Sequence, residues 1–215
     1  MNNFNKFKIF GRKKGKKKSN VSEIYLKNYL LDLDQDLQNK LIVLDIGSGN
    51  GESTLELAKK FKNKLIIASD VFEAGNINLS KQLNNHDITN VKIFDKNVLI
   101  FIDKFINKVF LDEVWILFPD PWPKKKHYKR RLINENFLKK IYLMLGKNNK
   151  IYIATDSISY LLSILCVVKK TGLYKWDNDR WQNWQYSNHN LYKTRFYEKS
   201  LKASRKSFFL ILSKI

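Results

Sequence analysis

The chain has 215 residues, of which 44% are hydrophobic and 13% aromatic, enough for a full-sized core and too many for a disordered chain. It carries 40 Lys and Arg against 20 Asp and Glu, a net charge of +20, which favours a polyanionic partner, either nucleic acid or an anionic membrane surface. Compositional drift toward Lys accounts for part of this excess, but less well for its clustering.

The cysteine and histidine usage excludes two kinds of site. Cys166 is the single cysteine, so neither a disulfide framework nor a Cys-based zinc site is possible. It lies in the apolar run LLSILCVV, and we expect a small core residue in a reducing compartment. The three histidines show no metal-ligand spacing, and we expect no metal. The first residues contain no apolar stretch of signal-peptide length, and no apolar run reaches about 18 residues, so we expect a soluble cytoplasmic protein without a membrane span.

The N-terminal segment is strongly basic. Six of the seven residues from Arg12 to Lys18 are Lys or Arg. Such runs form solvated, mobile or nucleic-acid-binding tails. We therefore expect a basic arm over residues 1–20 and a single domain over residues 21–215.

Strands and helices then alternate along the chain. Apolar, β-branched runs predict strands at residues 41–46, 64–70, 90–94, 112–118, 150–156 and 207–213. Helical spacing predicts helices at 52–61, up to about 84, at 99–108, 132–145 and 158–170, the last capped by Ser157. This order predicts an α/β fold with a mostly parallel sheet and helices on both faces. In such sheets ligands bind beyond the carboxyl ends of the strands.

A glycine-rich loop follows the first predicted strand, in the sequence DIGSGNGE. Gly47, Gly49 and Gly51 allow a tight turn and a close approach of the backbone to a ligand. The spacing is neither the G-x-G-x-x-G of dinucleotide binding nor that of a P-loop. Asp45, directly before the glycines, favours a cationic or hydroxyl-bearing ligand over a pyrophosphate.

Further acids follow the next two strands. Asp70 is placed to accept hydrogen bonds from ribose hydroxyls, with Glu73 as a substitute. Asp95 or Asn97 either reads an adenine edge or holds the loop. The set fits S-adenosylmethionine, which carries an adenosine, an amino-acid tail and a sulfonium cation but no phosphate.

The stretch FPDPWPKKKHYKRR follows the fourth predicted strand. Two prolines fix the backbone on either side of Asp120, and Trp122 offers a stacking face for a base. The Lys and Arg residues that follow supply phosphate contacts. An acid, an aromatic residue and a basic run at a methyl-donor site indicate a nucleic-acid methyltransferase. Guanine N7 is a suitable acceptor because its lone pair needs orientation but no general base.

The segments LDIGSGNGE, FPDPWPKKKHYKRRL, ATD and TRFYEK resemble the bacterial tRNA guanine-N7 methyltransferases, as does the basic FGRKKGKK near the start. The resemblance implies a Rossmann-like class I S-adenosylmethionine-dependent fold with a seven-stranded sheet. It implies that the chain methylates a guanine in the tRNA variable loop, as a monomer or homodimer.

The resemblance also implies roles for individual residues. The donor would be bound by Asp45, Gly47, Gly49, Gly51, Asp70, Asn97 and Asp120, with Asp120 also catalytic. The substrate would be bound by Lys124, Asp156, Thr194 and Glu198, and the RNA by Lys126, His127, Tyr128, Lys129, Arg130 and Arg131.

The sequence departs from the family at three places. Asp45 and Asp70 stand where the family usually has Glu, and TRFYEK is one residue longer than the family pattern, so Tyr197 competes with Glu198 for the substrate position.

Several alternatives stay open at this point. Asp156 would also serve as a helix cap, and the aromatic stretch from Lys175 to Lys193 either stacks on bases or packs as core or lid. The substrate could be another RNA or a basic protein, and a non-catalytic RNA-binding protein could retain the donor fold. A dehydrogenase is the least consistent reading, because its cofactor needs an anion-friendly loop.

Overall fold

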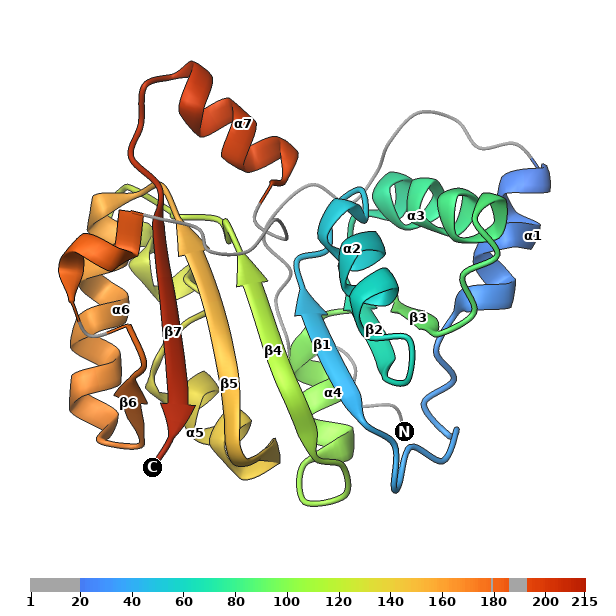
Figure 1. Ribbon diagram of the computed structural model, residues 1–215, viewed down its shortest axis with the longest axis horizontal. Coiled ribbons are helices and arrows are strands. Elements are labelled where there is room, and N and C mark those ends of the chain that lie inside the picture. The colour runs from blue at the N-terminus through green and yellow to red at the C-terminus, as the bar shows by residue number, and fades with distance from the viewer. Residues whose placement is uncertain (1–19, 179, 186–192) are drawn as a thin grey trace. The chain divides into compact units, whose positions relative to one another are not determined.

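The computed structural model describes residues 20–178, 180–185 and 193–215 (Figure 1). The chain divides into two compact units, and the division falls between Val109 and Phe110. The expected basic arm lies, but for its last residue, outside the described residues. The single domain expected over residues 21–215 stays a prediction.

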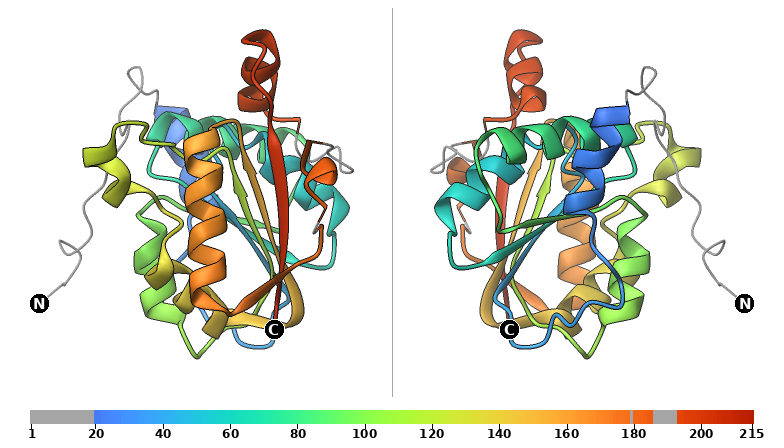
Figure 2. Two further views of the ribbon diagram at one scale, coloured as in Figure 1. Left: turned by 90° about the vertical axis from the view of Figure 1, so that its left-hand side faces the viewer. Right: turned by 90° about the vertical axis from the view of Figure 1, so that its right-hand side faces the viewer.

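The first unit contains three parallel strands in the order β3-β2-β1. They are β1 (Ile42–Ile46), β2 (Leu65–Ser69) and β3 (Val91–Phe94). Its helices are α1 (Asn20–Tyr29), α2 (Glu52–Lys60), α3 (Glu73–Asn85) and α4 (Val98–Phe105). Figures 1 and 2 show α2 and α4 on opposite faces of these strands.

The strand register of the first unit aligns the ends of its three strands. Every residue of β1 is buried, as its continuous apolar run predicts for a strand covered on both faces. Ile46 pairs with Ser69, and Ser69 pairs with Phe94. The segments that follow β1, β2 and β3 therefore begin at one edge of the strands, as expected from the parallel arrangement.

The second unit contains four strands in the order β4-β5-β7-β6. They are β4 (Leu111–Leu117), β5 (Leu145–Thr155), β6 (Tyr174–Trp176) and β7 (Phe208–Lys214). β4 and β5 are parallel, whereas β7 runs antiparallel to both β5 and β6. The helices are the 3-10 helix η2 (Lys125–Arg130), α5 (Glu135–Met144), α6 (Ile158–Thr171), the 3-10 helix η3 (Trp181–Gln185) and α7 (Arg195–Lys202).

Helix α6 covers one face of the strands of the second unit, and η3 lies on the other side (Figure 2). Tyr160, Leu161, Ile164 and Val168 form its buried stripe. Cys166 lies off this stripe and is exposed, so the prediction that it is a core residue was wrong. The run LLSILCVV is apolar around much of the helix, but only one stripe of a surface helix faces the core.

The predicted elements agree with the structure except at weak or short segments. All six predicted strands and five predicted helices are present, with ends that differ by a few residues, the largest difference being the earlier start of β5 at Leu145. The three-residue β6, α1 and α7 were not predicted. Within the described ranges, no helix is both long and apolar enough to cross a membrane.

Candidate functional site

Asp45, at the end of β1, is buried beneath the glycine loop. Its Oδ2 accepts hydrogen bonds from Ser53 Oγ at 2.9 Å and Thr54 Oγ1 at 2.7 Å, both in the first turn of α2. Burial raises the pKa of Asp45 to about 6, an effect that the two hydroxyls partly offset. The carboxyl group thus ties α2 to the strand end. Its contact with a methyl donor stays a prediction.

Asp70 joins the second strand end to the same glycine loop. Its Oδ2 accepts from the backbone N–H of Gly49 at 2.8 Å, and its Oδ1 accepts from that of Phe72 at 2.8 Å. Asn97 follows β3 and caps α4, since its side-chain oxygen accepts from the N–H of Leu99 at 3.0 Å. Asn97 therefore holds its loop, which is one of the two roles expected from the sequence.

The glycine loop is packed at one end and open at the other. Gly47 has a φ of 78°, and a methyl group placed on it would meet nothing within 4 Å among the described residues. A methyl group placed on Gly51 would instead come within 2.4 Å of the Leu79 side chain. The backbone at the open end is therefore accessible, and its close approach to a ligand stays a prediction.

Three buried polar atoms lie on segments adjoining this loop. Ser48 Oγ, Ser69 Oγ and Asn76 Oδ1 have no hydrogen-bond partner within the described part of the chain. Such atoms mark sites where a ligand or an ordered water completes the structure. Open backbone, buried hydroxyl and amide oxygens without partners among the described residues, and the Asp45 and Asp70 carboxyls fit a neutral or cationic adenosyl ligand.

In the second unit, Asp120 lies in a strained loop after β4. Phe118, directly before Pro119, and Trp122, directly after Pro121, have φ values of 52° and 42°, in the left-handed region. This conformation costs roughly 1–2 kcal/mol for a bulky side chain, and such strain is concentrated at functional sites. The loop is held to β5 by a 2.8 Å hydrogen bond from Phe118 N to Ala154 O. Asp120 itself is exposed.

The basic run forms η2 and its flanks, and most of its cations face solvent. Lys124 precedes η2, and Lys125, Lys126 and Lys129 are exposed. The Arg130 guanidinium lies 4.9 Å from the centroid of the Trp122 ring, and the His127 ring contacts that indole edge-on. Desolvation and then the neighbouring cations lower the pKa of His127, so it carries less positive charge near neutral pH than an ordinary histidine.

Arg131 differs from the rest of the predicted RNA-binding run. Its side chain is 3% exposed. It donates three hydrogen bonds to protein acceptors rather than facing solvent.

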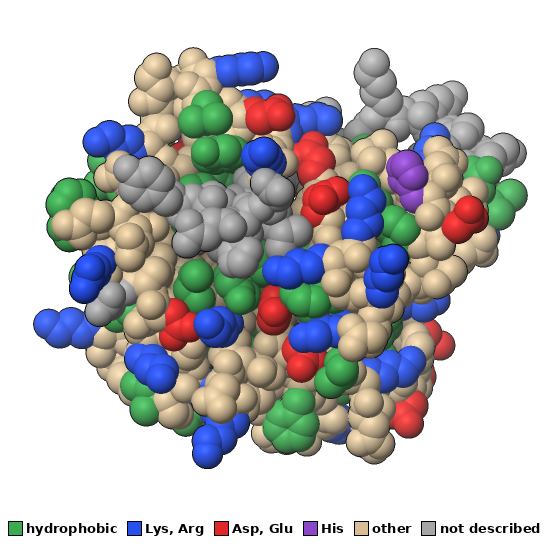
Figure 3. All heavy atoms as spheres, viewed as in Figure 1, with side chains coloured by type: hydrophobic (Ala, Val, Ile, Leu, Met, Phe, Trp, Pro, Cys, Tyr) green, Lys and Arg blue, Asp and Glu red, His purple; other side chains and the backbone are tan. Residues whose placement is uncertain are grey.

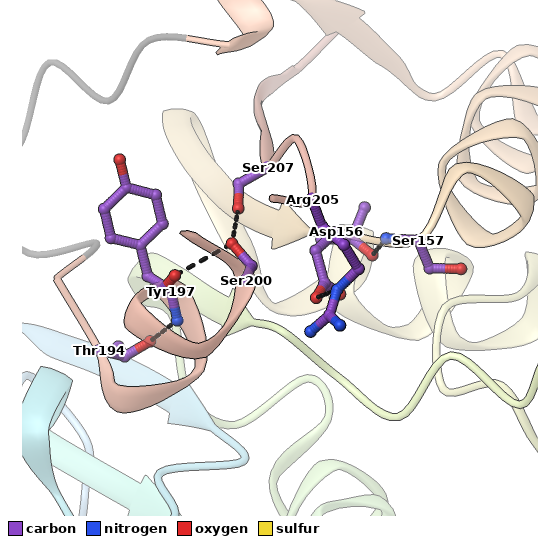
Figure 4. Close-up of polar contacts among 8 residues, drawn as sticks. Asp156, Ser157, Thr194, Tyr197, Ser200, Arg205 and Ser207 are labelled. Carbon is purple, nitrogen blue, oxygen red and sulfur yellow. Dashed lines mark hydrogen bonds and ion pairs between the residues drawn. The ribbon is translucent and has the colours of Figure 1, made fainter. Parts of the chain in front are cut away.

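Asp156 follows β5 and pairs with an arginine that the sequence did not single out. Its Oδ2 accepts from Arg205 Nε at 2.8 Å, and Figure 4 shows the two side chains pointing at one another. The N-cap of α6 is the next residue, Ser157, whose hydroxyl accepts from Tyr160 N. Capping was the alternative considered for Asp156, and the structure assigns it to Ser157.

The TRFYEK segment forms the start of α7. Thr194 is buried and caps the helix, its Oγ1 accepting from Tyr197 N at 3.2 Å. The Tyr197 ring lies 6.4 Å from the Phe118 ring and 5.8 Å from that of Phe209. Glu198 is exposed. Tyr197 thus packs against the Asp120 loop, and Glu198 has the accessible side chain.

Comparison with known proteins identifies the family. A family model described as putative methyltransferase matches residues 39–210. A tRNA (guanine-N(7)-)-methyltransferase of Neorickettsia sennetsu is 32% identical over 72% of this chain and 71% of its own length. The chain belongs to the tRNA (guanine-N7-)-methyltransferase family.

Two further curated proteins match the chain over different shares of their lengths. A tRNA (guanine-N(7)-)-methyltransferase of Nitrosomonas europaea is 37% identical over 59% of this chain and 57% of its own length. A bifunctional methyltransferase of Rickettsia felis is 30% identical over 96% of this chain, which corresponds to 40% of that protein.

Solved structures show the fold. An antibiotic-related methyltransferase has a TM-score of 0.59 at 16% identity and covers 94% of this chain and 98% of its own. A putative methyltransferase from Streptococcus mutans in complex with SAH has a TM-score of 0.54 at 17% identity, covering 93% and 100%. The chain therefore has the Rossmann-like α/β fold of class I methyltransferases, with seven strands among its described residues.

Several residues that shape this family member's site were not found from its sequence. Ser53 and Thr54 follow Asp45 by eight and nine residues. Their hydroxyls, in the first helical turn after the glycine loop, could have indicated that they bind the Asp45 carboxyl group. Ser159 and Arg205 have no comparable signal, because their partners are distant in the sequence.

The surface charge of this family member is dispersed on the face seen in Figure 3. Lys and Arg side chains are spread over that face, with acidic side chains among them.

Figure 2 shows η2 standing out beside the first turn of α6. Within the described ranges, no group of three or more His, Cys, Asp or Glu residues is placed to hold a metal ion.

Proposed function

We propose that this chain transfers the methyl group of S-adenosylmethionine to N7 of a guanine in the variable loop of tRNA. The observation that carries the proposal is the loop after β4. It presents an exposed carboxylate, Asp120, between two prolines on strained backbone, directly before the exposed cations of η2. A rigidly held acid beside a phosphate-binding surface suits orientation of a base.

The donor is proposed to lie against the open end of the glycine loop. Gly47 and Gly49 would offer backbone, and Asp70 would accept from the ribose hydroxyls. Bound S-adenosylmethionine would supply a methyl group on a positively charged sulfur, which leaves as a neutral thioether when the carbon–sulfur bond breaks. The further donor-binding residues proposed are Asp45, Gly51, Asn97 and Asp120.

The side chains that contact the guanine are proposed to orient it and not to take part in covalent chemistry. Guanine N7 carries an available lone pair, so no base has to remove a proton. Asp120 and Asp156 are proposed to hold the guanine with N7 directed at the methyl carbon, since correct orientation alone lowers the barrier. Lys124, Thr194 and Glu198 complete the proposed substrate contacts.

The exposed cations of η2 are proposed to bind tRNA phosphates. Lys126, Lys129 and the half-buried Arg130, with His127 and Tyr128 between them, would form this surface, and the basic residues 12–18 are proposed to bind further phosphates. Because tRNA is the substrate, we propose that the protein acts in the cytoplasm. It would act as a monomer or homodimer.

The test is methyl transfer from labelled S-adenosylmethionine to unmodified tRNA, with nucleosides identified by mass spectrometry. The expected product is 7-methylguanosine. A different methylated nucleoside, or transfer only to another RNA or to protein, would replace the proposed substrate. Donor binding without transfer to any tRNA would favour a non-catalytic RNA-binding protein.

A further inference from the structure

Arg131 is buried at the junction of two segments of the second unit. Its Nε donates to the carbonyl oxygen of Pro121 at 2.9 Å. Its two terminal nitrogens donate to Ser159, one to the carbonyl oxygen and one to Oγ, each at 3.0 Å. Arginine is almost never fully buried unless its donors are satisfied, so this arrangement is a built site for the guanidinium.

Two aromatic rings complete the surroundings of this guanidinium. Its central carbon lies 3.7 Å from the centroid of the Tyr128 ring and 4.9 Å from that of Tyr160. The faces of aromatic rings attract cations, and the attraction is stronger where water is excluded. With three hydrogen bonds and two rings around it, the Arg131 side chain would have to leave its site before it could contact a phosphate.

The acceptors of Arg131 adjoin both proposed guanine-orienting acids. Pro121 directly follows Asp120, in the loop flanked by the left-handed Phe118 and Trp122. Ser159 lies three residues after Asp156, and its Oγ is 3.2 Å from that of the helix-capping Ser157. One guanidinium therefore connects the backbone beside Asp120 to the helix start beside Asp156.

We infer that Arg131 is a positioning residue for methyl transfer and not an RNA phosphate contact. It holds the strained loop after β4 against the first turn of α6, and so fixes the two carboxylates relative to each other. The inference rests on the proposed function for its kinetic consequence. Its structural part, that Arg131 restrains the loop, stands independently of the substrate.

The fork of the guanidinium explains why lysine would not replace it. Arginine presents donors in a fixed plane, which reach Pro121 and Ser159 at the same time. Lysine keeps the charge but offers one compact ammonium group. Arg131→Lys therefore separates position from charge, and Ser159→Ala removes a single acceptor while leaving Arg131 in place.

The experiment compares four variants with the wild-type full chain. Arg131→Lys and Ser159→Ala test the restraint, Lys129→Gln tests a phosphate contact, and Lys139→Gln, on an exposed face of α5, controls for the loss of one positive charge. Single-turnover rate and kcat are measured at saturating tRNA. The tRNA Kd is measured at several salt concentrations, and hydrogen exchange is followed in peptides covering residues 117–122.

The expected results separate the two roles. Arg131→Lys should lower kcat by about 10- to 100-fold, because a small misplacement of orienting groups has effects of this size. Its tRNA Kd and salt slope should match those of the wild type. Ser159→Ala should show the same pattern at about 3- to 10-fold. Lys129→Gln should instead raise the Kd and reduce the salt slope by about one.

Two results would overturn the inference. One is an Arg131→Lys variant whose kcat and loop exchange equal those of the wild type. The other is a loss that is confined to tRNA affinity, with the salt slope reduced as in Lys129→Gln. If the wild type makes no 7-methylguanosine, the proposed function fails. Faster exchange of residues 117–122 in Arg131→Lys and Ser159→Ala then still decides whether Arg131 restrains the loop.

Discussion

The guanidinium Nε of Arg205 lies 2.8 Å from Oδ2 of Asp156, and this ion pair links the turn that precedes β7 to the end of β5 (Figure 4). The side chains are 51% and 22% exposed, respectively. The turn is tied down by a buried contact at 2.6 Å between the hydroxyls of Ser200 and Ser207. Asp156 is thus held from one side by an arginine whose backbone is fixed.

Removing Arg205 should affect substrate handling more than stability. Because the ion pair is partly exposed, Arg205→Gln should change the free energy of unfolding by less than about 1 kcal/mol. The Asp156 carboxylate would lose its orientation, and we expect kcat/KM for tRNA to fall by about 5- to 20-fold. Lys206→Gln, an exposed neighbour, is the matched control for charge. Equal losses in the two variants would show that Arg205 contributes only positive charge.

Asp120 should be needed for turnover and not for tRNA affinity. Asp120→Asn keeps the size of the side chain but removes its charge, and we expect kcat to fall by at least about 100-fold. Since phosphate contacts provide most of the affinity, the tRNA Kd should stay within about 2-fold. Asp36→Asn, an exposed acid before β1, controls for the loss of a carboxylate. Parallel losses of affinity and turnover would remove Asp120 from its proposed role.

Gly47→Ala should block the donor at small cost in stability. Its methyl group would point into open space, so the cost is the strain of a positive φ, roughly 1–2 kcal/mol. Gly172→Ala, at the C-cap of α6, is the matched control, because φ is 63° and the space around it is also open. Isothermal titration with S-adenosylmethionine should show about 10-fold or greater weakening for Gly47→Ala alone. Unchanged donor affinity would place the donor elsewhere.

Asp45 should make stability depend on pH in an unusual direction. Burial raises its pKa to about 6 from the ordinary 3.8, so between these values the folded state binds more protons at this site than the unfolded state. The contribution of Asp45 to the free energy of unfolding therefore falls as pH rises from about 4 to about 6, and is then constant. The full change is about 3 kcal/mol.

The Asp45→Asn variant isolates this contribution. Urea unfolding from pH 4 to pH 7.5 should show the free energy of unfolding of Asp45→Asn, minus that of the wild type, increasing up to about pH 6. Glu56→Gln, on the exposed side of α2, is the control for the loss of one carboxylate. A difference that is flat with pH would mean that Asp45 is ionised in the folded protein throughout this range.

Local patterns predicted the strand ends, and with them the places where Asp45, Asp70 and Asp120 stand. They could not predict which polar side chains are buried by tertiary contacts and so are unavailable to a ligand. Arg131 sits in a run of six cations within eight residues, and its tertiary contacts with Pro121, Ser159 and Tyr160 remove it from the surface. The prediction that Cys166 is a core residue was wrong for a related reason, since composition does not show which side of an apolar helix faces the core. The three-residue β6 has too few residues to show a period.

The most direct test of methyl transfer to guanine N7 replaces that nitrogen atom in the substrate. Two unmodified tRNAs are prepared that differ only at the variable-loop guanine, one with guanine and one with 7-deazaguanine, in which N7 is replaced by carbon. We expect methyl transfer to the first, giving 7-methylguanosine, and none to the second, with similar Kd values for both. Equal methyl incorporation into the two tRNAs would contradict transfer to N7.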